Sequence, residues 1–520
     1  MPGHLFVIDG DITRLRCDAW LLPTSRNWSI TKIWGNVPGV GAGGIYPNRP
    51  DSWPETGVFL HQEGEDGEPD IWLGDIGRSA LEDSGHYGDR AKSFAREAVA
   101  RIRDKRAAEL ALRGRRPVIA FNVLGSGHGG KRWLRGQLIN ELLPALVDIT
   151  NEEVDVVLVC YGPVMYSAVQ ATRRKLFGEV DQSPVWSTLD ETMRGKAVEL
   201  AALAQRGQLV LFMGAGISTD SGIPAWQGLL QEIATEVGLS PQEVDELSRF
   251  DPRDQASILQ ERYSGKISDL DASRMRVERY GLVHGLLASL PVRETVTTNF
   301  DQLFESASTA SGAELSILPG DDVTYGKRWL LKLHGDIGGD LVFTRSDYMG
   351  AMSSHSALRG IVQAMLMTRH MLFVGYALRD DDFHQLVHEV RFARGDNRNN
   401  FGTALVLESS GLTESLWKEI TFVATAKSDR PSADDYPRQR SWTYEAARQL
   451  WIFLDLVGML ESSEIMYVTD QSFGELKGHE EARLSELINE LRQLASGTGS
   501  SWPELTAFLE RFTNPVDENY

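Results

Sequence analysis

Residues 208–226 read QLVLFMGAGISTDSGIPAW, and this stretch decides the fold class. The apolar run 208–213 predicts a short buried strand. The glycine-rich turn 214–216 follows directly, so the backbone there can approach a pyrophosphate closely. Ile217 and Ser218 then predict the start of a helix, whose N-terminal amides favour phosphate. The stretch therefore predicts a strand–turn–helix unit with a dinucleotide at its turn.

Similar apolar runs recur downstream and alternate with amphipathic segments. Short buried strands that alternate with helices predict a Rossmann-type parallel sheet with helices on both faces. The further strands are expected at 293–298, 329–333, 371–375 and 403–408, after a helix over 190–206.

The N-terminal third has the same alternation and predicts a separate α/β/α sandwich. Its strands are expected at 5–8, 19–22, 117–123 and 154–161, and its helices over 90–113 and 133–149. Residues 46–89 are rich in Pro, Gly and acidic side chains and have the composition of an insertion.

Residues 177–190 are a plausible linker between the two patterns, and 478–495 form a charged amphipathic helix. With 520 residues the chain is too long for one core. We therefore expect three regions, at 1–182, 190–470 and 471–520, the last being a helical tail.

The composition limits the functional classes. With 53 basic and 73 acidic residues the formal net charge is −20, which argues against direct nucleic-acid binding. Only Cys17 and Cys160 occur, so no cysteine zinc site can form, and two buried reduced thiols are expected. No signal-peptide pattern and no membrane-spanning apolar run is present, so a cytoplasmic protein is expected.

Four ordered blocks resemble the NAD-binding blocks of the sirtuin family. They are GAGIS at 214–218 with SGIPAW at 221–226, TTNFD at 297–301, His334-Gly335, and GYAL at 375–378. The resemblance covers roughly residues 190–420. It implies a sirtuin-like domain whose NAD contacts come from Gly214, Ala215, Gly216, Ser218, Pro224, Trp226, Thr298, Gly375 and Tyr376.

The chain also departs from the sirtuin deacylases. Those enzymes carry a four-cysteine zinc module after the His-Gly block, whereas residues 336–370 contain no cysteine. The usual Asp-Phe-Arg is Ala225-Trp226-Gln227 here. An NAD pocket without a zinc module or an evident peptide clamp resembles the bacterial sirtuin-like NADases of antiphage defence. NAD is then a substrate, and no metal is expected.

Cleavage of the nicotinamide–ribose bond passes through an oxocarbenium-like state, so the site must hold the ribose and aim a water molecule. The resemblance implies that Asn299 positions water or ribose, that Asp301 holds the carboxamide, and that His334 acts on a ribose hydroxyl. Taken singly, Asn299 is also typical of a turn and His334 of a structural histidine. The run from Arg379 to Asp382 predicts a polar helix start, and metal binding there lacks partner ligands.

The N-terminal region resembles the macro domain, a family that binds ADP-ribose. It has a Gly-Asp-Ile start, an Asp-Ala strand, a glycine cluster, and a Gly-x-Gly-type loop after strand 117–123. The resemblance implies an ADP-ribose-type ligand held by Asp11, Ile12, Gly43, Gly44, Ser126, Gly127 and Gly129. Residues 23–27, PTSRN, replace the usual Asn-Ala-Ala-Asn, which favours binding over hydrolysis.

The sequence therefore favours an NAD glycohydrolase that releases nicotinamide and ADP-ribose, acts as a regulated defence effector, and assembles as a homo-oligomer. A deacylase or ADP-ribosyltransferase, and a non-catalytic NAD or ADP-ribose sensor, are the alternatives. The joint presence of Asn299, Asp301 and His334 favours the enzyme over the sensor.

Overall fold

The computed structural model describes most of the chain outside a set of gaps. The described residues are 2–25, 28, 30, 34–35, 37, 50–51, 53, 57–65, 68–75, 86–107, 110, 115–123, 134–263, 275–324, 326–337, 339, 341–354, 356–395, 400–432, 435–462, 465–497, 502, 505 and 509. Within them, no helix combines the length and apolar character needed to cross a membrane.

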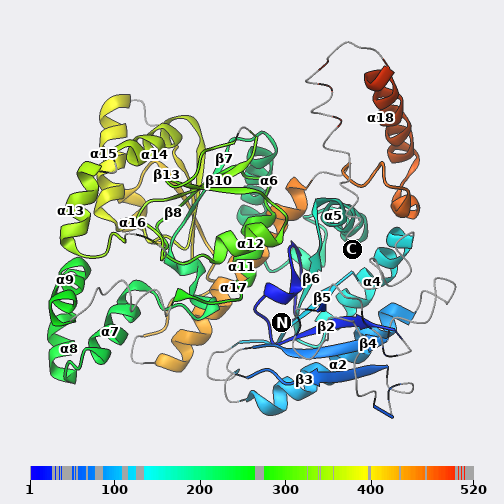
Figure 1. Cartoon of the computed structure of the whole chain (residues 1–520), viewed down its shortest axis with the longest axis horizontal. Helices are drawn as coiled ribbons and strands as arrows, with labels where there is room; N and C mark the ends of the chain where they lie inside the picture. Colours follow the sequence, from blue (N-terminus) through cyan, green and yellow to red (C-terminus); the bar gives the residue numbers. More distant parts are fainter. Residues whose placement is uncertain are drawn as a thin grey trace. The chain divides into compact units, whose positions relative to one another are not determined.

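The chain forms two compact units (Figure 1). Unit 1 comprises Met1–Arg194, Pro431–Glu445 and Asp455–Tyr520, and unit 2 comprises Gly195–Arg430 and Ala446–Leu454. The first boundary lies close to the predicted linker. The C-terminal boundary differs from the prediction, because the described residues 465–497 belong to the N-terminal unit instead of forming a separate tail.

Unit 1 contains a six-stranded sheet in the order β1-β6-β5-β2-β4-β3. All neighbouring strands are parallel except β3 and β4. The strands are β1 (Leu5–Asp9), β2 (Ala19–Thr24), β3 (Val58–Gln62), β4 (Asp70–Asp75), β5 (Val118–Asn122) and β6 (Asp155–Cys160). The stretch 46–89, expected to be an insertion, therefore contributes two strands to the sheet.

Helices α2 (His86–Lys105), α4 (Arg135–Thr150) and α5 (Pro163–Phe177) pack on this sheet. The core also includes Tyr467, Val468 and Phe473 from the C-terminal part of the chain. That part carries η7 (Gln471–Leu476) and α18 (His479–Gly497). Alternation of buried strands and helices thus produced the α/β sandwich that the sequence predicts.

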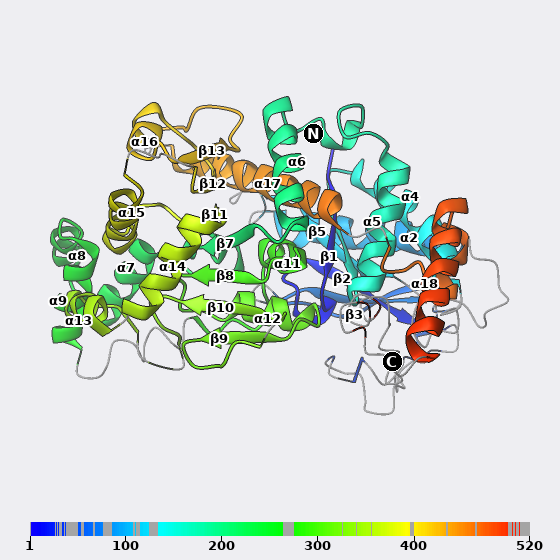
Figure 2. The ribbon, with the colours of Figure 1, turned by 90° about the horizontal axis from the view of Figure 1, so that it is seen from above.

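Unit 2 contains a seven-stranded, wholly parallel sheet in the order β13-β12-β11-β7-β8-β10-β9. The strands are β7 (Leu209–Met213), β8 (Glu294–Thr297), β9 (Leu315–Leu318), β10 (Arg328–Lys332), β11 (His370–Val374), β12 (Gly402–Val406) and β13 (Ile420–Ala424). Figure 2 shows β7, β8, β10 and β9 side by side. Later strands lie on both sides of β7, so the strand order reverses beside it, where doubly wound sheets bind ligands.

The helices of unit 2 form two groups. Helices α7 (Trp226–Glu236), α8 (Pro241–Leu247), α9 (Pro252–Arg262) and α13 (Arg345–Ser354) gather at one end of the unit (Figure 1). The others are α11 (Leu282–Ser289), α12 (Leu303–Ala310), α14 (Ser356–Thr368), α15 (Asp381–Arg394) and α16 (Gly411–Leu416). Helices α6 (Glu191–Gln205) and α17 (Tyr436–Glu461) have residues in both units.

The helix expected at Ile217 and Ser218 does not form. Two short 3-10 turns, Ala215–Ile217 and Thr219–Ser221, follow β7, and α7 begins only at Trp226. Gly222, with φ of 93°, adopts the left-handed conformation that interrupts a right-handed helix. The predicted phosphate site at a helix N-terminus is therefore corrected to an irregular loop.

Candidate functional site

Strand register brings the predicted blocks to one edge of the sheet. Met213 of β7 pairs with Thr297 of β8 and with Val374 of β11, and Thr297 pairs with Lys332 of β10. Asn299 and His334 each follow these paired positions by two residues. Both side chains therefore leave the sheet at its carboxyl edge, next to the reversal of strand order.

The glycines of the first block make room for the loop after β11. Gly214 N donates to Val374 O at 3.0 Å, and Gly216 N donates to Gly375 O at 2.9 Å. A Cβ atom on Gly214 would lie 2.7 Å from Gly375 O, and one on Gly216 would lie 2.8 Å from it. Gly375 itself has φ of 64°. Loop packing thus accounts for these glycines, and their contact with a pyrophosphate remains a prediction.

Asn299 and Ser218 connect the first two blocks. The Asn299 Nδ2 donates to Gly214 O and to Ser218 Oγ, each at 3.2 Å. Asn299 is 8% exposed, and its Oδ1 is buried without a hydrogen-bond partner among the described residues. A buried acceptor of this kind is uncommon and is often satisfied by a bound ligand or water.

Asp301 is held in the same cluster. Its Oδ2 accepts from Ser218 Oγ at 2.8 Å, and its Oδ1 accepts from Leu303 N at 3.1 Å. His284 of α11 lies beside them, with Nε2 3.4 Å from Ser218 Oγ. Burial lowers the pKa of His284 to about 4, although Asp301 and Asp220 act in the opposite direction. The imidazole is therefore neutral at neutral pH.

His284 was not among the predicted site residues. The available signal was a polar side chain within the otherwise apolar helix LVHGLLAS. Such a residue marks a buried polar contact, but its partner can be identified only once the fold is known.

Lys332 is a second residue that the sequence analysis missed. Its Nζ donates to the carbonyl oxygens of Phe300 and Asp301, at 3.2 and 2.8 Å, and pairs with Glu305 at 2.7 Å. It also pairs with Asp336 at 2.6 Å and is 2% exposed. Lys332 therefore ties the loop that carries Asn299 and Asp301 to the strand that leads to His334.

His334 is 6% exposed and meets the ring of Tyr348 edge to face, with 5.3 Å between the ring centroids. Its Nε2 is 3.3 Å from Asp380 Oδ2. His334, Asp380 and Asp382 offer ligand atoms that all lie within 4.8 Å of one another. The expectation that the aspartates lack a partner ligand is therefore wrong, since His334 stands next to them.

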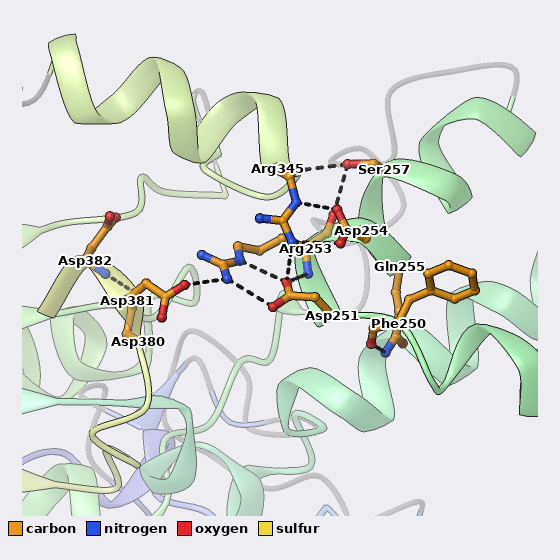
Figure 3. A network of polar contacts seen from close by, with 10 residues as sticks. All are labelled: Phe250, Asp251, Arg253, Asp254, Gln255, Ser257, Arg345, Asp380, Asp381 and Asp382. Atoms are coloured by element: carbon orange, nitrogen blue, oxygen red, sulfur yellow. Dashed lines mark hydrogen bonds and ion pairs between the residues drawn. The ribbon is translucent and has the colours of Figure 1, made fainter. Parts of the chain in front are cut away.

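The polar helix start predicted at Asp380 is confirmed. Asp380 is the N-cap of α15, and its Oδ1 accepts from Asp382 N at 3.0 Å. Figure 3 shows the surrounding network, in which Arg253 of α9 contacts both Asp251 and Asp381. Arg345 of α13 pairs with Asp254 and Asp251 in the same network.

The remaining predicted NAD residues have mixed surroundings. Trp226 packs against Phe300 and Phe343, with ring centroids 5.8 and 4.7 Å apart. The Tyr376 ring packs on Phe212 at 4.7 Å, so it belongs partly to the core. Thr298 N donates to Met213 O, and Ala215 O accepts from Ser218 N. Pro224 is half-buried just before α7.

Part of the ligand site predicted for the N-terminal unit can be placed. Asp11 caps a 3-10 turn (Ile12–Arg14), and its carboxylate accepts from Thr13 N and Thr13 Oγ1, both at 2.8 Å. Ile12 is buried. Gly43, Gly44, Ser126, Gly127 and Gly129 lie outside the described residues.

Comparisons with known proteins point to the same region. Residues 293–425 match a SIR2-like domain. The chain is 27% identical over 237 residues to Defense-associated sirtuin 2 of Bacillus subtilis, which covers 43% of this chain and 23% of that protein. It is 25% identical over 214 residues to the NAD(+) hydrolase ThsA of Enterococcus faecium, covering 37% of this chain and 42% of the relative.

The chain thus spans less than half the length of either relative. A solved structure of Sir2 homologues in complex with 2'-O-acetyl ADP ribose is 14% identical, covers 50% of this chain and 98% of its own, and gives a TM-score of 0.24. Because this TM-score is low, the fold is assigned from the strand order of unit 2.

Proposed function

We propose that unit 2 hydrolyses NAD to nicotinamide and ADP-ribose. The observation that carries the proposal is the buried, unpartnered Oδ1 of Asn299 at the sheet edge, beside Ser218 and Asp301 and level with His334. Resemblance to relatives named NAD hydrolases supports the substrate. The proposed NAD contacts are those that the resemblance implies, at Gly214, Ala215, Gly216, Ser218, Pro224, Trp226, Thr298, Gly375 and Tyr376.

In the proposed reaction the bond between the anomeric carbon and the nicotinamide nitrogen breaks, and its electron pair neutralises the pyridinium. A water oxygen then bonds to the anomeric carbon, and its proton passes to the surrounding solvent. Asn299 positions the water or the ribose, because a primary amide both donates and accepts. His334 accepts a proton from a ribose hydroxyl or orients it. Asp301 orients the nicotinamide carboxamide.

The experiment is quantification of nicotinamide and ADP-ribose after the full chain is incubated with NAD and no acylated peptide. Asn299→Ala and His334→Ala are each expected to lower turnover roughly a hundredfold or more. His388→Ala, which changes an exposed histidine of α15, serves as the matched control. Circular dichroism spectra establish that the variants are folded.

Full turnover by both folded variants would contradict the assignment of the site. NAD loss only in the presence of an acylated peptide would favour the deacylase, which the absence of cysteines in 336–370 argues against. Tight NAD binding without product would favour the sensor. The assay is run with and without EDTA, because we expect NAD cleavage to need no metal.

We further propose that unit 1 binds an ADP-ribose-type ligand and regulates the hydrolase, within a homo-oligomeric antiphage effector. The strand order of its sheet and the capping position of Asp11 support a macro-like fold. A ligand can activate only by binding the active state more tightly than the resting state. Adding ADP-ribose to the assay tests this, and an unchanged rate together with no ADP-ribose binding would contradict it.

A further inference from the structure

The carboxylate of Asp380 divides its two oxygens between the backbone and the imidazole of His334. Oδ1 accepts from Asp382 N at 3.0 Å and thereby caps α15. Oδ2 lies 3.3 Å from His334 Nε2. Because the cap fixes the carboxylate plane at the start of the helix, the direction of the second oxygen is set as well.

The imidazole of His334 has a buried nitrogen that lacks a hydrogen-bond partner in the described part of the chain, and Asp380 can supply one. Nε2 of His334 is buried and has no hydrogen-bond partner of good geometry among the described residues. At 3.3 Å the contact is long for a charge-assisted hydrogen bond. Catalytic hydrogen bonds are often long in a ligand-free site and shorten when substrate binds.

Several charged and titratable groups face this pair. Asp382 on the same helix has a raised pKa because of burial and the charge of Asp380. Tyr348 of α13 is half-buried, and burial together with Asp380 raises its pKa far above its usual value. Arg359 of α14 lies 3.6 Å from Asp382. Arg253 of α9 acts on Asp381 and Asp251.

The three successive aspartates differ in their ion pairs, although the charges of both Asp380 and Asp382 act on His334. Asp381 Oδ2 lies 2.6 Å from Arg253 Nη2, as Figure 3 shows. Asp382 Oδ1 lies 3.6 Å from Arg359 Nη1. Within the described part of the chain, His334 is the one basic side chain that forms an ion pair with Asp380. The charge of Asp380 is thus free to act on the imidazole.

We infer that Asp380 is a positioning residue that keeps a proton on Nε2 of His334 and leaves Nδ1 as the basic nitrogen. This inference rests on the proposed NAD hydrolysis. When Nδ1 takes the proton of a ribose hydroxyl, the carboxylate stabilises the imidazolium that forms, and it remains ionised itself. Asp380 touches neither substrate nor the reacting atoms in this arrangement.

Two substitutions separate this role from helix capping. Asn and Ser both cap helices well, so Asp380→Asn and Asp380→Ser preserve the start of α15. Asn removes the charge, and Ser also removes the reach to the imidazole. Glu246→Gln is the matched control, because it removes an exposed carboxylate from α8 of the same unit, and no ion pair recorded among the described residues includes Glu246.

Kinetics of nicotinamide release provide the first readout. Both Asp380 variants are expected to lower kcat roughly ten- to hundredfold, with KM changed less than about threefold, since the ribose contacts are intact. Glu246→Gln is expected to stay within about twofold of the unchanged chain. A kcat that is unaltered in both Asp380 variants would overturn the inference.

The second readout does not need NAD. Nitrogen-15 NMR of the His334 ring reports which of its two nitrogens carries the proton. In both Asp380 variants the fraction of rings protonated at Nε2 is expected to fall, because the carboxylate next to Nε2 is gone. An unchanged fraction would overturn the inference, whereas a changed fraction in a chain that never cleaves NAD would refute only the proposed function.

An EDTA arm tests whether Asp380 instead serves a metal ion, since the three side chains are close enough to hold one. Turnover that persists in EDTA supports the histidine–aspartate pair. Turnover abolished by EDTA and restored by Zn²⁺ or Mn²⁺ would overturn it.

Discussion

The buried Oδ1 of Asn299 is costly in the unliganded chain. A buried polar atom without a partner costs about 1–3 kcal/mol. The surrounding groups do not relax to satisfy it, because Ser218 already donates to Asp301 at 2.8 Å and Lys332 fixes the adjacent carbonyls. A ligand that donates to this oxygen recovers that free energy on binding. Asn299 therefore lowers the stability of the fold and raises its affinity for such a ligand.

His284 makes unit 2 sensitive to acid. Its pKa is lowered from 6.5 to about 4 by burial, so the folded state binds fewer protons than the unfolded state between these values. Stability is therefore full above pH 6.5 and falls as the pH is lowered towards 4. Each pKa unit is worth about 1.4 kcal/mol, which gives a loss of about 3 kcal/mol.

Amide hydrogen–deuterium exchange of α11 peptides between pH 7 and 4.5, corrected for intrinsic exchange, measures that loss. His284→Gln is expected to remove the part of the pH dependence that His284 causes. If the variant loses protection as steeply as the unchanged chain, another group is responsible for the acid sensitivity.

The sequence led to Asn299, Asp301 and His334 as candidates because each belongs to a block with a recognisable order, and their roles stay predictions. It did not point to His284, Lys332 or the pairing of Asp380 with His334. Those side chains have partners far away in the sequence, as in the Lys332–Glu305 and His334–Asp380 pairs. Residue type and local spacing carry no information about such pairs, whereas strand register does.

Among the elements, the loop after β11 and the turn after β7 depend on one another. Gly375 adopts φ of 64°, and a Cβ atom there would lie 2.5 Å from Ile217 N. Gly375→Ala is therefore expected to lower thermal stability and to reduce NAD turnover at least tenfold, because left-handed strain costs about 1–2 kcal/mol and the clash displaces Ile217 next to Ser218.

Gly395→Ala separates the two causes. Gly395 also has a positive φ, 62°, but nothing lies within 4 Å of an added Cβ atom. It should show the loss of stability that strain alone produces, with turnover preserved. Thermal unfolding and nicotinamide release measure both effects, and equal loss of turnover in the two variants would contradict the importance of the loop contact.

The predicted strands of unit 2 each correspond to a strand, because continuous apolar runs bounded by turns are a strong pattern. Two further strands, β9 (LSIL) and β13 (ITFVA), were not predicted. β9 is short and half-buried, and both stand at sheet edges, so their residues carry a weaker pattern. The helix expected after β7 failed because local turn residues outweighed the strand–turn–helix analogy.

At the scale of the whole molecule, unit 1 is completed by the C-terminal part of the chain. Asp455 and Arg173 are both fully buried, and Arg173 Nη1 donates to Asp455 Oδ1 at 2.8 Å. His4 Nε2 lies 2.7 Å from the other oxygen. Burial acts against the charge of Asp455, yet Arg173 and His4 keep its pKa below the usual value. The sequence could not predict this contact between residues 282 positions apart.

Asp455→Ala is therefore expected to destabilise unit 1 by about 3–5 kcal/mol, because it leaves Arg173 buried and uncompensated. The two cysteines of the chain, Cys17 and Cys160, are buried in unit 1, so their labelling by a thiol reagent reports the opening of that unit alone. The variant should label roughly a hundredfold faster or more under native conditions.

Two further variants define what that rate means. Glu475→Gln removes an exposed carboxylate from the same C-terminal part and should label like the unchanged chain. Arg173→Met combined with Asp455→Leu removes both charges, and it should recover much of the protection, since apolar replacement of a buried pair is often tolerated. Unchanged labelling in Asp455→Ala would mean that Asp455 does not stabilise unit 1. Fast labelling that the double variant reverses would instead attribute the stabilisation to the pairing of these two charges.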